Sequence, residues 1–194
     1  MSKPIIGIDM DGVICRPPLG FNLRIGRGPY HNPLDEDGLA GVAPPSPRLR
    51  RSPIRVVLET LKYLGRSPMP DAHAALLAIK EHRDLVLITS RSGLVQGLVE
   101  SWLARNRMLE LFDAVHTNHT GLRSPEFKWH MVSQQGIREF IDDDGRVADL
   151  LARKGLKRIY LRDWPRNRGY RYPENVVRVG SLAEVPGYLA GAES

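Results

Sequence analysis

The sequence predicts an α/β fold: a mainly parallel β-sheet with helices on both faces and a small loop-rich insertion. Two observations lead to this prediction. Short, almost wholly apolar runs recur along the chain, as strands buried on both faces require. Segments with apolar residues at helical spacing separate these runs, and such alternation is typical of parallel sheets. The length of 194 residues and the hydrophobic fraction of 42% suffice for one domain with an insertion.

Six runs are the predicted strands. They combine β-branched and large aliphatic residues, which suit a sheet covered on both faces. In chain order they are 4–9, 85–89, 114–116, 138–141, 158–161 and 176–179.

Four segments between the runs are predicted to be helical. Segments 71–82, 92–105 and 147–154 each place aliphatic residues on one face, and Gly155 would end the third. A last helix would open at Ser181, which forms a capping-box pattern with the glutamate three residues later. Pro186 would shorten or kink that helix.

Residues 16–70 differ in composition from the rest of the chain. They hold ten of the fifteen prolines, which remove backbone donors and fix φ, so most of this stretch cannot be regular. One helix is predicted within it, with Ser52 as N-cap and Gly65 as the C-terminal stop. Nine basic and four acidic residues give the segment +5 of the net charge of +6. We therefore predict a cap insertion at 16–70 and a core made of 1–15 and 71–194.

Composition also limits the class of protein and its partners. The single cysteine, Cys15, excludes an internal disulfide, indicates a reducing compartment, and is expected to be a buried small hydrophobe. No stretch approaches the ~18 apolar residues of a membrane helix, and Asp9 comes too early for a signal peptide. We expect a soluble cytoplasmic protein without a membrane partner. Its basic balance favours a phosphorylated small molecule or a nucleic acid, unless the charges simply solvate the surface.

Two carboxylates follow the first predicted strand. Asp9 and Asp11 lie on the same side of the chain, and Gly12 permits an abrupt turn after them. In parallel sheets, ligands bind outside the carboxyl ends of the strands. Such a pair suits Mg²⁺ and nucleophilic or acid–base work on a phosphoryl group. The alternative is a turn aspartate that caps its own backbone.

Polar residues also follow the second predicted strand. Thr89, Ser90 and Arg91 form a group of donors that could hold a phosphate. Alternatively, Thr89 or Ser90 caps the following helix.

The fourth predicted strand ends in three consecutive acids. Asp142, Asp143 and Asp144 repel one another unless solvent or a cation relieves the repulsion. Lys128 is the only lysine between Thr89 and these acids.

These motifs, in this order, resemble the four motifs of the haloacid dehalogenase (HAD) phosphohydrolases: DMDGV, LITS, a later lysine and IDDD. The resemblance covers roughly 1–15 and 71–194, and 16–70 falls where this superfamily inserts its first type of cap. The stretches 159–167 and 176–179 resemble the nucleotidase branch related to 5'(3')-deoxyribonucleotidases.

The resemblance implies a Mg²⁺-dependent phosphomonoesterase. Asp9 would be the nucleophile that forms an aspartyl-phosphate, and Asp11 would protonate the leaving oxygen and then activate water. Lys128 would offset charge on Asp9 and the phosphoryl group. The phosphoryl oxygens would be held by Thr89, Ser90 and Arg91. Mg²⁺ would bind the Asp9 carboxylate, the Asp11 carbonyl and Asp142, with Asp143 binding directly or through a water, although the register of the three acids stays open.

The expected substrate is a small phosphorylated metabolite, with a nucleoside monophosphate as the first candidate. The alternatives are a phosphatase of nucleic-acid ends or sugar phosphates, and a non-catalytic module of the same fold that binds nucleic acid through its basic loops.

Three further groups of residues carry weaker patterns. His116 and His119 have a ligand-like spacing but no matching pair elsewhere, so we expect no metal role. Trp129 and His130 are expected to pack beneath the site. Segment 164–172 interleaves three arginines with three aromatic residues, which fits either a loop packed at the sheet edge or stacking on a nucleic-acid base.

Overall fold

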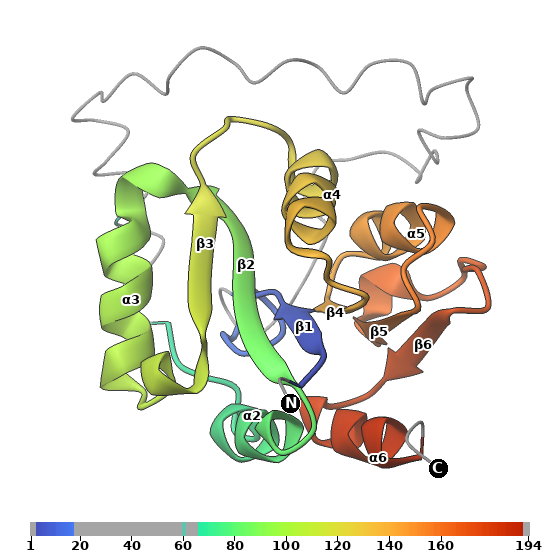
Figure 1. Cartoon of the computed structure of the whole chain (residues 1–194), viewed down its shortest axis with the longest axis horizontal. Coiled ribbons are helices and arrows are strands. Elements are labelled where there is room, and N and C mark those ends of the chain that lie inside the picture. Colours follow the sequence, from blue (N-terminus) through green and yellow to red (C-terminus); the bar gives the residue numbers. More distant parts are fainter. Residues whose placement is uncertain (1–2, 18–59, 61–65, 192–194) are drawn as a thin grey trace.

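The computed structural model describes residues 3–17, 60 and 66–191, which form a six-stranded sheet in the order β3-β2-β1-β4-β5-β6 (Figure 1). All neighbouring strands pair in parallel. The strands are β1 (Ile5–Ile8), β2 (Asp84–Ser92), β3 (Ala114–Asn118), β4 (Glu139–Asp142), β5 (Arg158–Arg162) and β6 (Val176–Val179). The predicted parallel α/β sheet is confirmed, and each of the six apolar runs is a strand.

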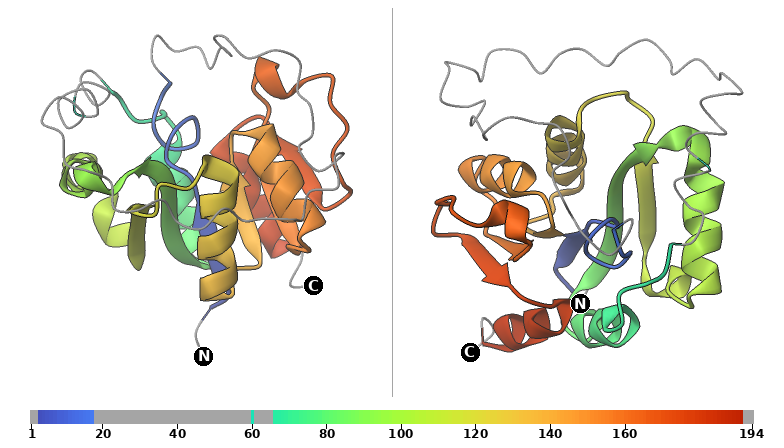
Figure 2. Two further views of the ribbon diagram at one scale, coloured as in Figure 1. Left: turned by 90° about the horizontal axis from the view of Figure 1, so that it is seen from above. Right: turned by 180° about the vertical axis from the view of Figure 1, so that it is seen from behind.

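Helices cover both faces of this sheet (Figure 2). One face carries α4 (Ser124–Gln135) and α5 (Gly145–Arg153), which pack against each other. The other face carries α2 (Ala72–Lys80), α3 (Gln96–Arg105) and α6 (Val185–Ala190). Two buried apolar clusters correspond to the two faces, one centred on side chains such as Trp102 and the other on side chains such as Phe127. The inner strands are therefore buried from both sides, whereas the edge strands β3 and β6 are partly exposed.

Helix α4 was not among the predicted helices. Its sequence, SPEFKWHMVSQQ, has no continuous apolar stripe, and its buried residues are Phe127, Lys128 and Val132. Proline in the first turn and Gly136 at the end, with φ of 64°, are the local signals for its two boundaries. Burial of a lysine on this helix hides the amphipathic pattern that sequence analysis depends on.

Two predicted element boundaries need correction. Strand β2 continues past Thr89 to Ser92, so that Ser90 and Arg91 belong to the strand. The Ser92 hydroxyl accepts a hydrogen bond from the Leu94 N–H, so Ser92 caps the next turn, and neither Thr89 nor Ser90 does.

The last helix begins as predicted but is built differently. The capping box at Ser181 and Glu184 is present and opens a short 3-10 turn, η5 (Leu182–Glu184), ahead of α6. Pro186 lies in the first turn of α6, where its missing N–H costs no helical hydrogen bond, and does not interrupt the helix.

Trp129 and His130, the two residues after Lys128, were both expected to pack beneath the site, and only Trp129 packs against an apolar cluster. Trp129 packs against the cluster beneath α4 and α5, with Lys154 Nζ 5.5 Å from its ring centroid. His130 is exposed, so its predicted packing role is wrong.

Most of the predicted cap insertion lies outside the described residues, including all but Thr60 of the helix predicted from Ser52. The two ends of the segment are described and run side by side. The Arg16 N–H donates to the Ser67 carbonyl and the Met69 N–H to the Ile14 carbonyl, both at 2.9 Å. Within 3–17, 60 and 66–191, no helix is long and apolar enough to cross a membrane.

Candidate active site

Side chains from several strand ends converge on one cleft of about 460 Å³ at the carboxyl edge of the sheet. Seven of the eight predicted catalytic, binding and metal residues line it, and so does Asp144: the seven are Asp9, Asp11, Thr89, Ser90, Arg91, Lys128 and Asp143. Asp142, the remaining predicted site residue, is fully buried and does not line the cleft.

Lys128 contacts two carboxylates of the site, Asp9 and Asp142. Its Nζ lies 3.0 Å from Asp9 Oδ1 and 2.7 Å from Asp142 Oδ2, and all three side chains are almost wholly buried. Burial outweighs the attraction of Lys128 and raises the pKa of Asp9 to about 7. Burial alone would lower the pKa of Lys128, but Asp142 and Asp9 raise it, so the lysine is charged. A permanent cation therefore lies beside the predicted nucleophile.

The three consecutive acids have three different surroundings. Asp142 accepts hydrogen bonds from Lys128 and, at 2.8 Å, from the Asp144 N–H. Asp143 Oδ2 lies 2.8 Å from Arg166 Nη2, at the wall of the cleft. Asp144 caps α5 by accepting the Arg146 N–H at 2.9 Å. Of Asp142 and Asp143, it is Asp143 that lines the cleft, and Asp142 is buried beneath it.

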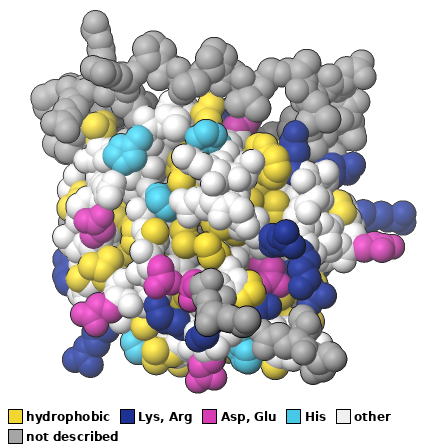
Figure 3. Space-filling model, viewed as in Figure 1, with side chains coloured by type: hydrophobic (Ala, Val, Ile, Leu, Met, Phe, Trp, Pro, Cys, Tyr) yellow, Lys and Arg dark blue, Asp and Glu magenta, His cyan; other side chains and the backbone are white. Residues whose placement is uncertain are grey.

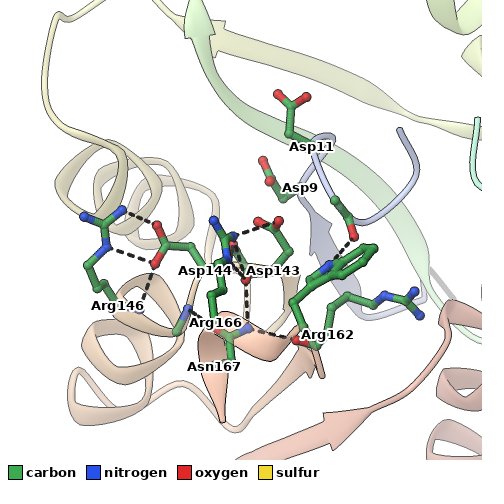
Figure 4. A network of polar contacts seen from close by, with 12 residues as sticks. Asp9, Asp11, Asp143, Asp144, Arg146, Arg162, Arg166 and Asn167 are labelled. Carbon is green, nitrogen blue, oxygen red and sulfur yellow. Dashed lines mark hydrogen bonds and ion pairs between the residues drawn. The ribbon is translucent and has the colours of Figure 1, made fainter. Parts of the chain in front are cut away.

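Three carboxylates of the site could share one cation. Oxygen atoms of Asp9, Asp142 and Asp143 all lie within 4.8 Å of one another. Figure 4 shows Asp9 and Asp143 close together, whereas the Asp11 side chain points away from them. Hard oxygen donors at this density suit Mg²⁺.

The Asp11 carboxylate is held by two arginines. Arg91 contacts both of its oxygens, with Nε 2.7 Å from Oδ2 and Nη2 2.6 Å from Oδ1. Arg66 Nη1 lies 2.6 Å from the same Oδ1. Burial opposes ionisation here, but the two guanidinium groups hold the pKa of Asp11 below its usual value. Sequence analysis missed Arg66, whose only signal was its membership of the basic segment 16–70.

The hydroxyl residues at the end of β2 face the same cleft. Thr89 is 1% exposed, and its Oγ1 lies 3.4 Å from the Arg91 N–H that it accepts. Ser90 donates to Ser124 Oγ at 2.6 Å, which ties β2 to the start of α4. Both residues line the cleft, and their role in holding a phosphoryl group stays a prediction.

The loop after β5 braces the two acidic turns, a role that sequence analysis did not predict. Trp164 Nε1 donates to the Gly12 carbonyl at 3.0 Å. Arg166 Nη2 and Asn167 Nδ2 donate to the Asp143 carbonyl at 2.7 and 2.9 Å (Figure 4). These bonds reach main-chain carbonyls, so they fix where the turns run, and Arg166 also reaches the Asp143 carboxylate.

The remaining candidates, Cys15, His116 and His119, do not line the cleft. Cys15 is buried and free, and burial raises the pKa of its thiol to about 11, so it is the predicted small hydrophobe. His116 bonds to Gln135, while His119 bonds to Gln96, so the two histidines are not joined by a shared ligand geometry.

Comparisons with known proteins establish the fold. No protein-family model matches the chain, and no curated protein does. Among solved structures, a haloacid dehalogenase-like hydrolase from Streptococcus pneumoniae superposes with a TM-score of 0.62 at 12% identity, covering 96% of this chain and 98% of that one. A HAD-superfamily hydrolase from Ehrlichia chaffeensis gives 0.55 at 16% identity, with both chains wholly covered. A predicted phosphoglycolate phosphatase from Haemophilus somnus gives 0.56 at 13% identity, covering 97% and 98%. The chain therefore has the HAD-like fold.

Proposed function

We propose that this protein is a Mg²⁺-dependent phosphomonoesterase that acts through an aspartyl-phosphate on a small phosphorylated metabolite. The observation that carries the proposal is the placement of Asp9, Lys128 and Asp143 in one cleft at the carboxyl edge of a HAD-like sheet. Phosphoryl transfer needs positioning and charge neutralisation more than elaborate covalent chemistry, and this arrangement supplies both.

In the proposed first step, an Asp9 carboxylate oxygen attacks phosphorus and the bond to the leaving oxygen breaks. Asp11 takes up a proton once its carboxylate has left the two arginines and passes that proton to the leaving oxygen, so the alcohol departs neutral. Asp11 then removes a proton from a water molecule, which attacks phosphorus and releases inorganic phosphate with Asp9 restored. Lys128 stabilises the negative charge on Asp9 and the phosphoryl group throughout. Thr89 and Ser90 are the proposed donors to the scissile phosphoryl oxygens, and Arg91 is a proposed donor to an anionic group of the substrate.

The carboxylates of the cleft fit a Mg²⁺ ion. Asp9 and Asp143 face the cleft and would bind the metal directly, with the Asp11 main-chain carbonyl as a further oxygen donor. Both oxygens of Asp142 already accept hydrogen bonds, so we assign it to holding Lys128. When bound, Mg²⁺ supplies charge neutralisation for the phosphoryl oxygens.

A nucleoside monophosphate is the first substrate to test, because the stretches 159–167 and 176–179 resemble the deoxyribonucleotidase branch. The neighbours described as a phosphoglycolate phosphatase and a β-phosphoglucomutase favour small phosphorylated substrates in general. Sugar phosphates and nucleic-acid ends remain in the same reaction class. A cytoplasmic location is part of this proposal, since the only cysteine of the chain is a free thiol.

The non-catalytic alternative is less well supported. A nucleic-acid-binding module of this fold would use the basic segment 16–70, most of which lies outside the described residues. Among the described side chains on the face seen in Figure 3, lysines and arginines stand among acidic ones. Salt separates the two functions, because affinity for a nucleic-acid backbone falls by a power law with salt concentration.

The direct test is a phosphatase screen over nucleotides, sugar phosphates and oligonucleotide ends, with and without Mg²⁺. We expect Mg²⁺-dependent release of phosphate, and a borohydride-reducible acyl phosphate on Asp9 identified by mass spectrometry. Hydrolysis that proceeds unchanged in Asp9→Asn protein would refute the mechanism.

A further inference from the structure

The two arginines that hold Asp11 form a compact cationic site inside the cleft. Three guanidinium N–H groups point at two carboxylate oxygens, all at 2.6 or 2.7 Å. The side chains of Arg66 and Arg91 are 12% and 7% exposed, so their charges are largely withdrawn from solvent. Two guanidinium groups at such short range can bind an anion with paired oxygens, either a carboxylate or a phosphate.

The backbone holds both arginines in place. The Arg66 carbonyl accepts the Trp102 indole N–H at 2.9 Å, and the next residue, Ser67, bonds to Arg16 at 2.9 Å. Arg91 lies within strand β2. Because both residues are anchored to the core, the cationic site does not have to be assembled when a ligand arrives.

This site lies beside the reacting centre and serves a different carboxylate. Lys128 contacts Asp9 and Asp142, whereas Arg66 and Arg91 contact Asp11. All of these groups except Asp142 line the same cleft of about 460 Å³. A ligand could therefore reach the reacting centre with one anionic group and the two arginines with another.

We propose that Arg66 and Arg91 bind a second anionic group of the substrate, a carboxylate or a second phosphate, which takes the place of the Asp11 carboxylate. This inference rests on the proposed phosphomonoesterase function. Released from the arginines, Asp11 is free to turn toward the leaving oxygen. The substrate class is then a small phosphomonoester with a second negative group, and a nucleoside 3',5'-bisphosphate fits it better than a nucleoside 5'-monophosphate.

Substrate pairs that differ only in the second anion test the proposal. 3-Phosphoglycerate and glycerol 3-phosphate share a three-carbon skeleton, and an adenosine 3',5'-bisphosphate and 5'-monophosphate pair repeats the comparison on a nucleoside. We expect kcat/KM to favour the member with the second anion by about 30-fold or more, the worth of one or two charge-assisted hydrogen bonds. In Arg66→Gln protein we expect this preference to fall to within about threefold in at least one pair.

Arg168→Gln is the matched control. Arg168 is 63% exposed, pairs with Asp163 and does not line the cleft, so the preference ratio should stay at its wild-type value. Equal kcat/KM values within both pairs in the wild type would overturn the proposal. So would an equal loss for both members of a pair in Arg66→Gln, because the arginines would then serve the scissile phosphoryl group.

Binding to the Asp9→Asn protein separates this inference from the proposed function. Calorimetry at fixed salt and Mg²⁺ should show 3-phosphoglycerate binding about 30-fold more tightly than glycerol 3-phosphate. The added Arg66→Gln substitution should remove the difference. Equal affinities in the Asp9→Asn protein would overturn the inference even if the wild type hydrolyses phosphomonoesters. If the wild type hydrolyses no phosphomonoester but the Asp9→Asn protein shows the 30-fold difference in affinity, the phosphatase mechanism would be overturned. The inference that Arg66 and Arg91 bind a second anion would still hold.

Discussion

Charged side chains are buried at both ends of the sheet, and the two ends differ in how their charges are matched. At the amino end, Arg83 Nε lies 2.6 Å from Glu139 Oε2, with side chains 3% and 4% exposed. At the carboxyl end, the single ammonium group of Lys128 faces Asp9 and Asp142, with Asp143 close by. The first group pairs opposite charges, whereas the second gathers more negative charge than its lysine neutralises.

This difference teaches what distinguishes a structural ion pair from a reactive centre. Burial of charge is common to both ends, so burial alone does not identify function. A buried pair of opposite charge is roughly neutral for stability compared with apolar residues of the same size. An excess of carboxylates that opens onto a cleft requires a further cation or proton, and that requirement ties the carboxyl end to ligand binding.

The largest expected effect follows from removing the proposed nucleophile. Asp9→Asn keeps the shape of the side chain but supplies a poor nucleophile and metal ligand, so we expect kcat to fall by a factor on the order of 10⁴. Steady-state assays check the loss, and circular dichroism checks the fold. Asp113→Asn, at the opposite edge of the sheet, should retain activity within about twofold. The amide oxygen of the substituted side chain can still accept the Leu85 N–H, as the Asp113 carboxylate does. Comparable losses in the two variants would erase the distinction between the two ends.

Loss of the buried cation at each end should separate activity from stability. Lys128→Met leaves the repulsion between Asp9 and the phosphoryl group unrelieved, and we expect kcat/KM to fall at least ~100-fold, or about 2.7 kcal/mol. Arg83→Met strands Glu139 and should cost about 3–5 kcal/mol of stability. Activity per folded molecule should nevertheless stay within about threefold of wild type in Arg83→Met. A dead but stable Arg83→Met protein would contradict this assignment.

Mg²⁺ should stabilise the protein through the carboxyl end alone. At about 100 times its Kd, a ligand that binds only the native state adds about 2.7 kcal/mol, or roughly 5–10 °C in Tm for a chain of this size. We expect this rise in thermal melts, its reversal by a chelator, and its loss in Asp143→Asn. Glu139→Gln should melt at a lower temperature but respond to Mg²⁺ as the wild type does. A Mg²⁺ response retained by Asp143→Asn would exclude that carboxylate as a ligand.

The smallest expected effect is on the pH dependence of protein stability, measured with a chelator present. The pKa of Asp9 is raised to about 7, so the folded state holds a proton there that the unfolded state releases near pH 4. The resulting stability is present at low pH and is lost as pH rises through about 7. Burial lowers the pKa of His116, which acts in the opposite direction over part of this range.

Denaturant titrations at pH 5 and pH 8 measure the slope of this dependence, the change in the free energy of unfolding with pH. Asp9→Asn should lose much of it, whereas the contribution of His116 is the same in both proteins and cancels in the comparison. An unchanged slope in Asp9→Asn would show that Asp9 titrates near its ordinary value.

The sheet could be predicted from sequence because its inner strands are buried on both faces and are therefore mostly apolar. Helix α4 could not, because Lys128 occupies a buried position that apolar periodicity assigns to a hydrophobic residue. The end of β2 was placed too early for a similar reason: Ser90 and Arg91 are polar strand residues that face a cleft.

The site was predictable where its chemistry sits at strand ends, as with Asp9 and Thr89. Its partners were not, since Arg66 is 55 residues from Asp11 in sequence, and only the folded chain brings them into contact. The order of the three acids was equally hidden. Their separate contacts depend on how the chain turns after β4 and on Arg166 from the loop after β5.

The two segments that flank 18–65, residues 14–16 and 67–69, are hydrogen-bonded to each other. This pairing has a consequence for replacing the stretch between them. Arg16 bonds to Ser67 and Ile14 to Met69, so the core itself sets the points at which the inserted stretch departs and returns. When two ends already meet, the closure cost of the stretch between them grows only with the logarithm of its length. We therefore expect that a stretch of different length grafted between residues 17 and 66 would leave the sheet, the acidic turns and Arg66 in place.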